Sequence, residues 1–435
     1  MKTFKKGGIH PKEEKLTAGY PIVEIPVPAE LRIMLSQSIG APSKAVVKVG
    51  DHVEAGQMIA EAGGFVGAPV HTPVAGTVKK LEPTRTPQGI WQDSIVIVPD
   101  PGPADTTTEP RPEDEIMGMT PKEIIAIVGD SGIVGLGGAT FPTRVKLTIP
   151  EGKSADTVII NGAECEPYLT CDDALMRAEA DKILKGAKLI MKATGATRGI
   201  VGIEQNKPEA IAAMKAAAGS YPDIEVETLK TKYPQGGEKQ LIFAVTGRTV
   251  PAGGLPIETG CIVDNVATAY AVWDAVYNRR NLTERIVTVT GPSLTNPGNF
   301  LVKNGTPLSA LIEAAGGLPE DTGKIIAGGP MMGRAVSTLE ATATKGLSGL
   351  VVLPESESMR KPAGPCIRCT RCVVACPMGL EPYLFMLQAE NQVWDGMAEH
   401  GVMNCIECGS CSYSCPASRP LLDFIKLGKQ ELRKK

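Results

Sequence analysis

Two cysteine runs near the C-terminus decide the fold of this chain. They are Cys366-x-x-Cys369-x-x-Cys372-x-x-x-Cys376-Pro377 and Cys405-x-x-Cys408-x-x-Cys411-x-x-x-Cys415-Pro416. In each run the first three thiols lie close enough together on a tight loop to bind one compact metal centre, whereas the fourth is directed away from it. A proline then turns the chain out of the loop. The doubled pattern therefore indicates two metal centres in one domain.

This is the spacing by which bacterial two-cluster ferredoxins hold a pair of [4Fe–4S] clusters, with the fourth thiol of each run bound to the other cluster. We therefore expect two clusters with crossed ligand sets. The first set is Cys366, Cys369, Cys372 and Cys415, and the second set is Cys405, Cys408, Cys411 and Cys376. Because such clusters carry single electrons, the domain predicts a role in electron transfer.

Zinc binding and disulfide formation are the alternative uses of these thiols. A structural zinc needs one tetrahedral set, typically two spaced Cys-x-x-Cys pairs, and has no use for a doubled run with trailing prolines. Disulfides are disfavoured because Met1–Gly8 is basic and polar and lacks an apolar signal stretch, which predicts a reducing cytoplasm. Three of the 11 cysteines remain and are expected to be buried small hydrophobes: Cys165, Cys171 and Cys261.

Composition narrows the classes of function. The 435 residues predict about three domains, and the formal net charge of −3 argues against nucleic acid or an anionic membrane surface as a partner. The 48 glycines and 35 prolines show no repeat period and predict many ordered turns. The chain has no apolar run of about 20 residues; the nearest candidate, 124–143, contains Asp130 and several glycines. We therefore expect any membrane attachment to occur through partner proteins.

Residues 1–98 are expected to form an N-terminal barrel-sandwich module. Between Ala45 and Leu81, Asp51-x-Val-x-x-Gly-Gln followed by Pro73-Val-x-Gly-Thr-Val resembles lipoyl and biotinyl carrier domains. Those carriers present a lysine on the hairpin between the two halves, and residues 62–71 contain none. We therefore expect a structural or docking module. The histidines of this region are expected to pack or to face solvent: His10, His52 and His71.

A linker rich in proline and threonine, residues 99–120, ends at Thr120-Pro121-Lys122-Glu123, which has the cap, proline and acid of a helix start. The helix leads into Gly135-Leu136-Gly137-Gly138-Ala139-Thr140-Phe141. Closely spaced glycines allow backbone N–H groups to approach a phosphate, whose charge Arg144 or Lys146 could neutralise. Because Thr140 replaces the third glycine of the Rossmann fingerprint, this stretch by itself fits a nucleotide loop and a mobile turn equally well.

The strand predicted at 157–160 delivers Asn161-Gly162-Ala163-Glu164-Cys165-Glu166-Pro167 at its carboxyl end, where α/β sheets bind ligands. The amide and the two carboxylates suit sugar hydroxyls, and a solvated acidic loop is the alternative. Further α/β alternation follows, with helices expected at 172–193, 208–218 and 267–277 and strands at 199–203 and 224–229.

Together these motifs resemble a known family. The stretches Gly-x-Gly-Gly-Ala-x-Phe-Pro-Thr (135–143), Asn-x-x-Glu-x-Glu-Pro (161–167), Tyr-x-x-Gly-Gly-Glu (233–238) and Asp-Asn-Val-x-Thr (264–268) recur in this order in the flavin- and NADH-binding subunit of respiratory complex I. With the N-terminal module and the paired cysteine runs, nearly the whole chain resembles the C-subunit family of the Rnf electron-transport complex.

The resemblance implies that residues 121–284 bind FMN and NAD(H), with no catalytic side chain beyond the cofactors. It assigns the FMN phosphate and its surroundings to Gly137, Gly138 and Lys146. It assigns the ribityl chain and ring to Asn161, Glu164, Asp264, Asn265 and Thr268. It assigns the nicotinamide nucleotide to Phe141, Glu166 and Glu238, the last of which follows the glycine pair Gly236 and Gly237.

Two modules are expected after this domain. Residues 285–353 resemble the small β-grasp module that follows the flavin domain in these proteins, and a spacer role is favoured there over ligand binding. Residues 354–435 are expected to form the two-cluster ferredoxin-like domain, with a helix over 381–399 between the cysteine runs. The expected fold is therefore a multidomain α/β chain with barrel-sandwich, complex I flavin-subunit-like, β-grasp and ferredoxin-like modules.

The resemblance further implies an ion-translocating oxidoreductase subunit of the NADH:ferredoxin type, bound peripherally at the cytoplasmic face of the cell membrane. Its expected cofactors are two [4Fe–4S] clusters and FMN, with NAD(H) as substrate. Its expected partners are the membrane-embedded and iron–sulfur subunits of the complex and, indirectly, ferredoxin, but not nucleic acid. Two alternatives stay open: a soluble reductase of the cobalamin-reductase type, and a non-catalytic iron–sulfur electron adaptor. The pumped ion, sodium or proton, and the direction of electron flow are not decided by the sequence.

Overall fold

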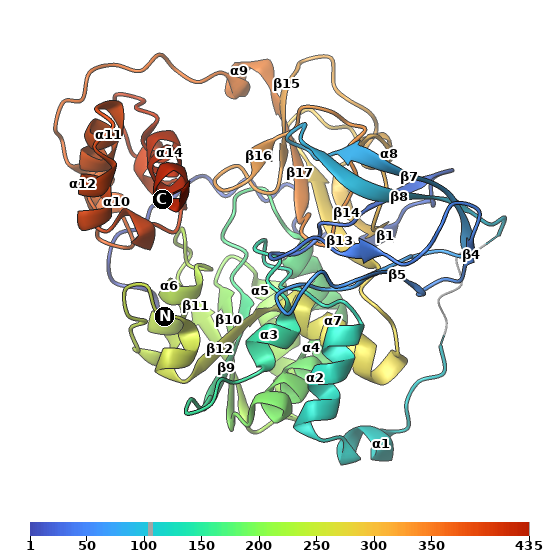
Figure 1. The fold of residues 1–435 in the computed structure, drawn as a ribbon. Helices are drawn as coiled ribbons and strands as arrows, with labels where there is room; N and C mark the ends of the chain where they lie inside the picture. Colours follow the sequence, from blue (N-terminus) through green and yellow to red (C-terminus); the bar gives the residue numbers. More distant parts are fainter. Residues whose placement is uncertain (103–107, 435) are drawn as a thin grey trace.

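The computed structural model describes residues 1–102 and 108–434 (Figure 1). Residues 103–107, which belong to the predicted linker, lie outside the described residues. An α/β domain, called here the central domain (residues 113–284), occupies the lower half of the view in Figure 1. Two β-rich modules lie above it on one side, and the helical C-terminal module lies above it on the other.

The central domain is built on a four-stranded parallel sheet in the order β11-β10-β9-β12. The strands are β9 Thr157–Gly162, β10 Arg198–Glu204, β11 Ile224–Leu229 and β12 Cys261–Asn265. Because parallel strands are joined by crossover helices, both faces of the sheet are covered and the strand residues are largely buried. The carboxyl ends of all four strands meet at one edge, so the loops that follow them come together there.

Helices cover the two faces of this sheet. Val158, Ile160 and Val201 belong to the core cluster that contains residues of α2, α4, α5 and α7. The alternate residues Ile159 and Ile200 pack instead with α6. The bounds are α1 Glu113–Gly118, α2 Pro121–Asp130, α3 Thr143–Leu147, α4 Cys171–Thr194, α5 Pro208–Ala218, α6 Glu238–Thr246, the 3-10 helix η1 Pro256–Thr259 and α7 Val266–Asn278. The predicted start of α2 is confirmed, because Thr120 caps it in a capping box with Glu123.

Residues 31–99 form the barrel module, two small sheets in the orders β2-β8-β7-β4 and β3-β5-β6. The bounds are β2 Leu31–Met34, β3 Lys44–Ala45, β4 His52–Val53, β5 Met58–Glu61, β6 Val70–His71, β7 Gly76–Arg85 and β8 Trp91–Pro99. Leu31, Ile59 and Ile97 are fully buried between the two sheets. His71 is buried as well, whereas His10 and His52 are exposed.

The first 24 residues run across other modules. Strand β1, Ile22–Glu24, pairs in parallel with a strand of the β-grasp module. Lys2 forms a bridge with Leu229, and Ile9 pairs with Tyr233 in the central domain. Gly8 donates a backbone hydrogen bond to Ala375 in the C-terminal module. The N-terminal segment therefore ties three modules together.

The β-grasp module carries a six-stranded sheet in the order β1-β14-β13-β17-β15-β16. The bounds are β13 Glu284–Thr290, β14 Gly298–Lys303, α8 Leu308–Ala314, β15 Thr322–Ala327, β16 Arg334–Ala335 and β17 Gly349–Pro354. Helix α8 packs on the sheet through Leu308 and Leu311, which are fully buried. The loop between β15 and β16, residues 328–333, reaches the central domain and is called here the Gly-Pro-Met loop.

The C-terminal module is helical. Helix α9, Glu355–Ser358, directly follows β17 and lies beside β15 of the β-grasp module (Figure 1). The bounds of the other helices are α10 Arg371–Ala375, α11 Pro382–Glu390, α12 Trp394–Glu399, the 3-10 helix η2 Val402–Asn404, α13 Ser410–Tyr413 and α14 Leu421–Lys434. The single helix expected over 381–399 is wrong: two helices occupy this range, and Gln392 between them has a φ of +56°, which a helix cannot accommodate. No helix in residues 1–102 or 108–434 is long and apolar enough to span a membrane.

Candidate functional site

The first glycine loop, residues 135–141, lies at the carboxyl edge of the central sheet. The backbone N–H of Leu136 donates to the hydroxyl of Thr268 at 2.9 Å, which joins the loop to α7. A β-carbon at Gly137 would lie 3.5 Å from the side chain of Asn265. Gly138 has a φ of +109°, and among the described residues none apart from its two chain neighbours would lie within 4 Å of a β-carbon there. The structure thus brings together Gly137, Gly138, Asn265 and Thr268 around backbone that a ligand can approach closely.

An ion pair between Lys146 and Asp264 lies at the same edge of the sheet. Nζ of Lys146 lies 3.0 Å from Oδ1 of Asp264 and donates to the carbonyl of Val263 at 2.6 Å. Burial opposes the charge on Lys146, but the carboxylates of Asp264 and Glu238 outweigh it and raise the pKa of the amine. Burial raises the pKa of Asp264. Among the described residues, Oδ2 of Asp264 has no hydrogen-bond partner, so one buried acceptor is left for a ligand.

The two predicted amides hold neighbouring loops in place. Nδ2 of Asn161 donates to the carbonyl of Gly236 at 2.8 Å and so joins the loop after β9 to the second glycine pair. Nδ2 of Asn265 donates to Asp172 at 2.7 Å, while its Oδ1 caps α7 by accepting from the N–H of Ala267 at 2.8 Å. Both amides therefore organise the backbone at the carboxyl edge of the central sheet, and their predicted contact with the ribityl chain stays a prediction.

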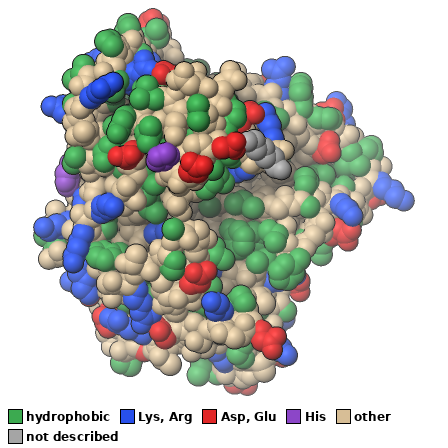
Figure 2. Space-filling model, turned by 60° about the vertical axis from the view of Figure 1, so that its left-hand side comes forward, with side chains coloured by type: hydrophobic (Ala, Val, Ile, Leu, Met, Phe, Trp, Pro, Cys, Tyr) green, Lys and Arg blue, Asp and Glu red, His purple; other side chains and the backbone are tan. Residues whose placement is uncertain are grey.

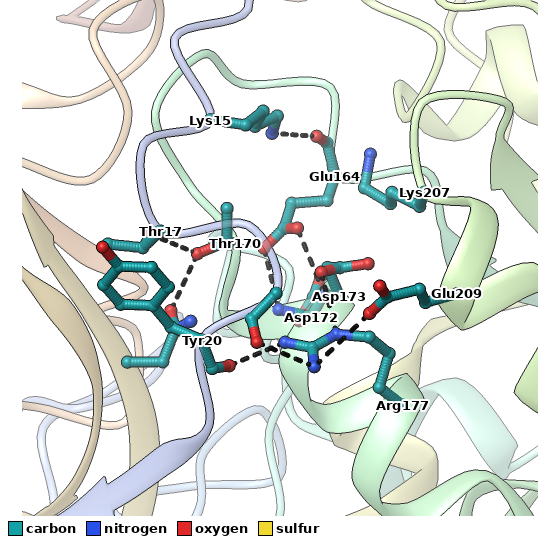
Figure 3. A network of polar contacts seen from close by, with 12 residues as sticks. Lys15, Thr17, Tyr20, Glu164, Thr170, Asp172, Asp173, Arg177, Lys207 and Glu209 are labelled. Carbon is teal, nitrogen blue, oxygen red and sulfur yellow. Dashed lines mark hydrogen bonds and ion pairs between the residues drawn. The ribbon is translucent and has the colours of Figure 1, made fainter.

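The carboxylate of Glu164 is directed at the start of α4. Its two oxygens accept from the backbone N–H groups of Asp172 and Asp173 at 2.7 and 3.2 Å. These N–H groups have no partner within the helix, so the carboxylate stabilises the helix N-terminus. Figure 3 shows the same carboxylate facing α4. The side chain predicted to meet the ribityl chain is thus already hydrogen-bonded twice in this structure.

Lys15 is a site residue that the sequence analysis missed. Its Nζ donates to the backbone carbonyls of Glu164, Glu166 and Leu169 at 2.9, 2.9 and 2.6 Å. Next to it, the hydroxyls of Thr17 and Thr170 lie 2.5 Å apart (Figure 3). The N-terminal segment therefore holds in place residues 164–169 of the central domain, called here the acidic loop. The carbonyl partners of Lys15 lie 149 to 154 positions further along the chain, so no local pattern could have indicated them.

The carboxylate of Glu166 binds the Gly-Pro-Met loop. Its Oε2 accepts from the N–H of Met331 at 3.0 Å and its Oε1 from the N–H of Met332 at 2.8 Å. A β-carbon at Gly329 would lie 2.3 Å from Oε2, so the loop can approach this closely only with glycine at that position. Burial raises the pKa of Glu166 to about 7. Glu166 is predicted to lie near the nicotinamide ribose. In this structure both of its carboxylate oxygens instead accept hydrogen bonds from the β-grasp module.

The second glycine pair precedes α6. The N–H of Gly236 approaches the sulfur of Cys165 at 3.3 Å, and Cys165 is buried enough that its pKa rises to about 12. A β-carbon at Gly237 would lie 2.6 Å from Oε1 of Gln240. Glu238 is the first residue of α6, and burial raises its pKa although Lys146 opposes the rise. Gly237 and Glu238 therefore lie close to Lys146 and Asp264.

Phe141 ends the first glycine loop. Its carbonyl accepts from the N–H of Gly135 at 2.8 Å, which closes the loop, and the residue is partly exposed. Partial exposure leaves room for a contact with a ligand. Of the three cysteines outside the two runs, Cys171 and Cys261 are buried as expected, whereas Cys165 is only partly buried.

The eight cysteines of the two runs line two separate pockets. One pocket is lined by Cys366, Cys369, Cys372 and Cys415, called here the outer set. The other is lined by Cys376, Cys405, Cys408 and Cys411, called here the inner set. Each pocket therefore combines three thiols of one run with the fourth thiol of the other run.

The two sets differ in exposure and in neighbours. Cys366 and Cys369 of the outer set are exposed, whereas Cys376, Cys408 and Cys411 of the inner set are each 7% exposed. The inner set also lies against the central domain. Met378, two residues after Cys376, accepts a hydrogen bond from Nε2 of Gln240 at 3.2 Å. Of the two sets, the inner set is therefore the one that lies next to the central domain, which carries the glycine loops.

The surface around these modules is mixed in character. Figure 2 shows basic, acidic and hydrophobic side chains interspersed over the visible face, with no single sign of charge covering it. This agrees with the formal net charge of −3.

The residues present fit the groups that the sequence implies. For a flavin phosphate, the first glycine loop offers open backbone and Lys146 offers a positive charge. For a hydroxyl of the ribityl chain, Oδ2 of Asp264 offers an acceptor that has no partner among the described residues. For two [4Fe–4S] clusters, each pocket offers the four thiols that one cluster requires. Burial raises the pKa of Cys405 to about 11, so a cluster must displace the thiol proton when it binds.

Four protein families match successive parts of the chain. Residues 2–102 match the RnfC barrel sandwich hybrid domain, and residues 128–274 match the Nuo51 FMN-binding domain. Residues 286–335 match the SLBB domain, and residues 358–416 match a 4Fe-4S dicluster domain. The last match includes all eight cysteines of the two runs. The predicted fold class, four modules of these types in this order, is confirmed.

Curated relatives match over nearly the whole chain. The C-subunit of the Na(+)-translocating ferredoxin:NAD(+) oxidoreductase complex of Acetobacterium woodii is 42% identical over 99% of this chain and 97% of the relative. The C-subunit of the proton-translocating ferredoxin:NAD(+) oxidoreductase complex of Clostridium ljungdahlii is 40% identical over 100% of this chain and 94% of the relative.

Among solved structures, a chain of an NAD+-reducing [NiFe]-hydrogenase in the air-oxidized state has a similar fold. The TM-score is 0.52, with 19% sequence identity, and the match covers 72% of this chain and 65% of the hydrogenase chain. At this identity the likeness concerns the fold alone.

Proposed function

Because this chain belongs to the RnfC family of ion-translocating ferredoxin:NAD(+) oxidoreductase complexes, we propose that it passes electrons between NAD(H) and ferredoxin within such a complex. The observation that carries the proposal is the position of the inner cysteine set, which lies directly against the loops of the FMN-binding-type domain. One chain thus holds a candidate flavin site and two four-thiol sites in contact.

The proposed FMN site is the carboxyl edge of the central sheet. The residues proposed to surround it are Gly137, Gly138, Lys146, Asn161, Glu164, Asp264, Asn265 and Thr268. Lys146 would neutralise the phosphate, and its pairing with Asp264 keeps the amine charged. The glycine loop would supply backbone N–H groups. When bound, FMN exchanges hydride with nicotinamide and single electrons with iron–sulfur clusters.

The proposed nicotinamide side of the site is formed by Phe141, Gly236, Gly237, Glu238 and Glu166. Phe141 is partly exposed and can stack on a ring. Glu238 carries a carboxylate that suits ribose hydroxyls. Glu166 can accept hydrogen bonds from ribose hydroxyls only after it releases the N–H groups of Met331 and Met332. Nicotinamide binding through Glu166 therefore requires the Gly-Pro-Met loop to move.

The two cysteine sets have different proposed neighbours. The inner set would hold the cluster that faces the flavin domain, and the outer set the cluster that faces a partner protein. The exposure of Cys366 and Cys369 supports the second assignment, because a partner must approach a cluster closely to exchange electrons with it. No further catalytic side chain is required.

Membership in this family implies other subunits of the same complex as partners. We propose that the membrane-embedded and iron–sulfur subunits hold this chain at the cytoplasmic face of the membrane, and that ferredoxin is reached through them. The exposed edge of the outer set, at Cys366 and Cys369, is the place where such a subunit would accept or deliver electrons.

Anaerobic purification with flavin and iron quantified, followed by NADH titration in the visible spectrum, tests this function. We expect one FMN and about eight irons per chain, with the flavin bleached and the clusters reduced by NADH. Iron without flavin, and no response to NADH after FMN is added back, would favour the non-catalytic adaptor instead. Reduction of a cobalamin by the isolated chain at a rate matching NADH oxidation would favour the soluble reductase.

A further inference from the structure

Tyr233 lies three residues before the glycine pair Gly236 and Gly237, and it connects this loop to the inner cysteine set. The side chain is 2% exposed, and its hydroxyl donates to the backbone carbonyl of Cys408 at 2.8 Å. Its backbone N–H and carbonyl are both paired with Ile9 at 2.9 Å. The tyrosine is therefore fixed at its backbone, and its hydroxyl reaches across a module boundary to a cysteine of the inner set.

Glu166 extends this connection on the other side of Tyr233. The Glu166 carboxylate lies near the tyrosine hydroxyl and holds the N–H groups of Met331 and Met332. The Gly-Pro-Met loop then returns to the inner set, because a β-carbon at Gly409 would lie 3.0 Å from the carbonyl oxygen of Met331. Three modules thus converge on the loop that contains Cys408.

Apolar side chains close the space between these polar contacts. Ile9, Tyr233, Ala375 and Cys408 form one buried cluster, against which Cys165, Met331 and Ile406 pack. These residues come from four parts of the chain: the N-terminal segment, the central domain, the β-grasp module and the C-terminal module. The inner cysteine set is therefore shielded from water on the side that faces the central domain.

We propose that Tyr233 is a positioning residue that, together with Glu166, holds the Cys408 loop against the central domain and keeps water away from the inner cluster. The proposal rests on the proposed function, in that it requires the inner set to bind a cluster. In this proposal Tyr233 controls the surroundings of the inner cluster. Glu166 helps to hold the Cys408 loop in place, in addition to its proposed contact with nicotinamide.

The physical consequence concerns the reduction potential of the inner cluster. Hydrogen bonding and solvent exposure around a cluster set its potential, and water favours the reduced form because that form carries more negative charge. Removing the Tyr233 hydroxyl leaves the buried carbonyl of Cys408 without this donor. The loop then opens, water approaches, and the midpoint potential of the inner cluster shifts to more positive values.

The test uses the full chain loaded with its cofactors and the variants Tyr233→Phe, Glu166→Gln and Tyr413→Phe. Tyr413 lies in the same module as the inner set and is 54% exposed, so it controls for the loss of a hydroxyl. Potentials are read by redox titration with electron paramagnetic resonance, and the inner cluster is identified as the signal missing from Cys376→Ala. Amide hydrogen exchange over 328–333 and 405–411 reports loop opening.

We expect Tyr233→Phe to shift the inner potential to more positive values and to speed exchange over 405–411, with the outer potential unchanged. Glu166→Gln should speed exchange over 328–333 and shift the inner potential less. Tyr413→Phe should change neither. Wild-type potential and exchange in both Tyr233→Phe and Glu166→Gln would overturn the proposal. Wild-type protein that binds no iron would instead refute the proposed function, so the two failures are distinguishable.

If Tyr233→Phe does not retain the inner cluster, Glu166→Gln decides the question alone. This substitution keeps the shape of the side chain and an acceptor oxygen, and it leaves the Tyr233 ring in place. A positive shift of the inner potential together with faster exchange over 328–333 supports the proposal. An unchanged inner potential despite faster exchange over 328–333 overturns it, because the loop would then have no effect on the cluster.

Discussion

Nζ of Lys146 lies 3.0 Å from Oδ1 of Asp264, and among the described residues the second oxygen of that carboxylate has no hydrogen-bond partner. The pair therefore holds a charged amine next to the first glycine loop, at the place proposed for the FMN phosphate.

Replacing Lys146 by methionine should weaken FMN binding about 10- to 100-fold, because one charge-assisted hydrogen bond to the phosphate contributes about 1.5–3 kcal/mol. Fluorescence titration of the flavin-free protein measures the affinity. Lys153 is an exposed lysine shortly after α3, and Lys153→Met serves as the matched control with unchanged affinity. Equal FMN affinity in Lys146→Met and the wild type would remove Lys146 from the site.

The crossed cysteine sets predict which variants behave alike. Cys376 and Cys405 come from different runs but line the same pocket. Alanine at either position should therefore remove the same cluster and lower the iron content from about eight to about four per chain. Alanine at Cys366 should remove the other cluster. Iron analysis and electron paramagnetic resonance check this, and a shared spectrum for the Cys366 and Cys376 variants would contradict the crossed pairing.

Lys15→Met should loosen the acidic loop of the central domain. The substitution leaves three backbone carbonyls without the amine that they share, which costs about 1–3 kcal/mol for a buried acceptor left unpaired. We expect faster amide exchange over 164–169 and a lower midpoint in denaturant. Lys12, an exposed residue three positions earlier, gives the control variant Lys12→Met. The role of Lys15 is refuted when both variants exchange at the wild-type rate.

Lys345 should make stability depend on pH. Its buried amine donates to the carbonyls of Pro69 in the barrel module and Gly132 in the central domain at 2.8 and 2.7 Å. Burial lowers the pKa of Lys345 from 10.5 to about 7. Between these pH values the unfolded chain binds the proton and the folded chain does not, so stability rises as the pH increases through this window.

Comparison with Lys345→Met isolates this effect, because the variant lacks the titrating amine. We expect the difference in unfolding free energy between wild type and variant to grow in favour of the wild type from pH 7 to pH 10, by up to about 4 kcal/mol over these three pH units at 1.36 kcal/mol per unit. Chemical denaturation at several pH values measures it. A difference that stays constant with pH would show that Lys345 keeps its proton when folded. His71 lies nearby, but burial lowers its pKa to about 3, so it does not titrate in this range.

Much of the architecture could be predicted because it is encoded by residues near one another in sequence. The cysteine spacing, the cap of α2 at Thr120 and the β-branched strand before Asn161 are local patterns, and covalent geometry limits what each can form. The same holds for the glycine pairs, whose backbone freedom is a property of single residues. Local reasoning failed at Gln392, where one left-handed residue divides an apparently continuous helix.

The sequence by itself determined the four modules, the eight metal-binding thiols and the loops at the carboxyl edge of the central sheet, because each depends on spacing along the chain. Only the tertiary structure decided that Glu164 stabilises α4, that Glu166 holds the Gly-Pro-Met loop, and that Tyr233 reaches Cys408. The contacts of Glu166 and Tyr233 join residues 165 to 175 positions apart. Such contacts form only when several modules pack at once, so the hydrogen-bonding partners of a buried side chain are fixed by the fold as a whole.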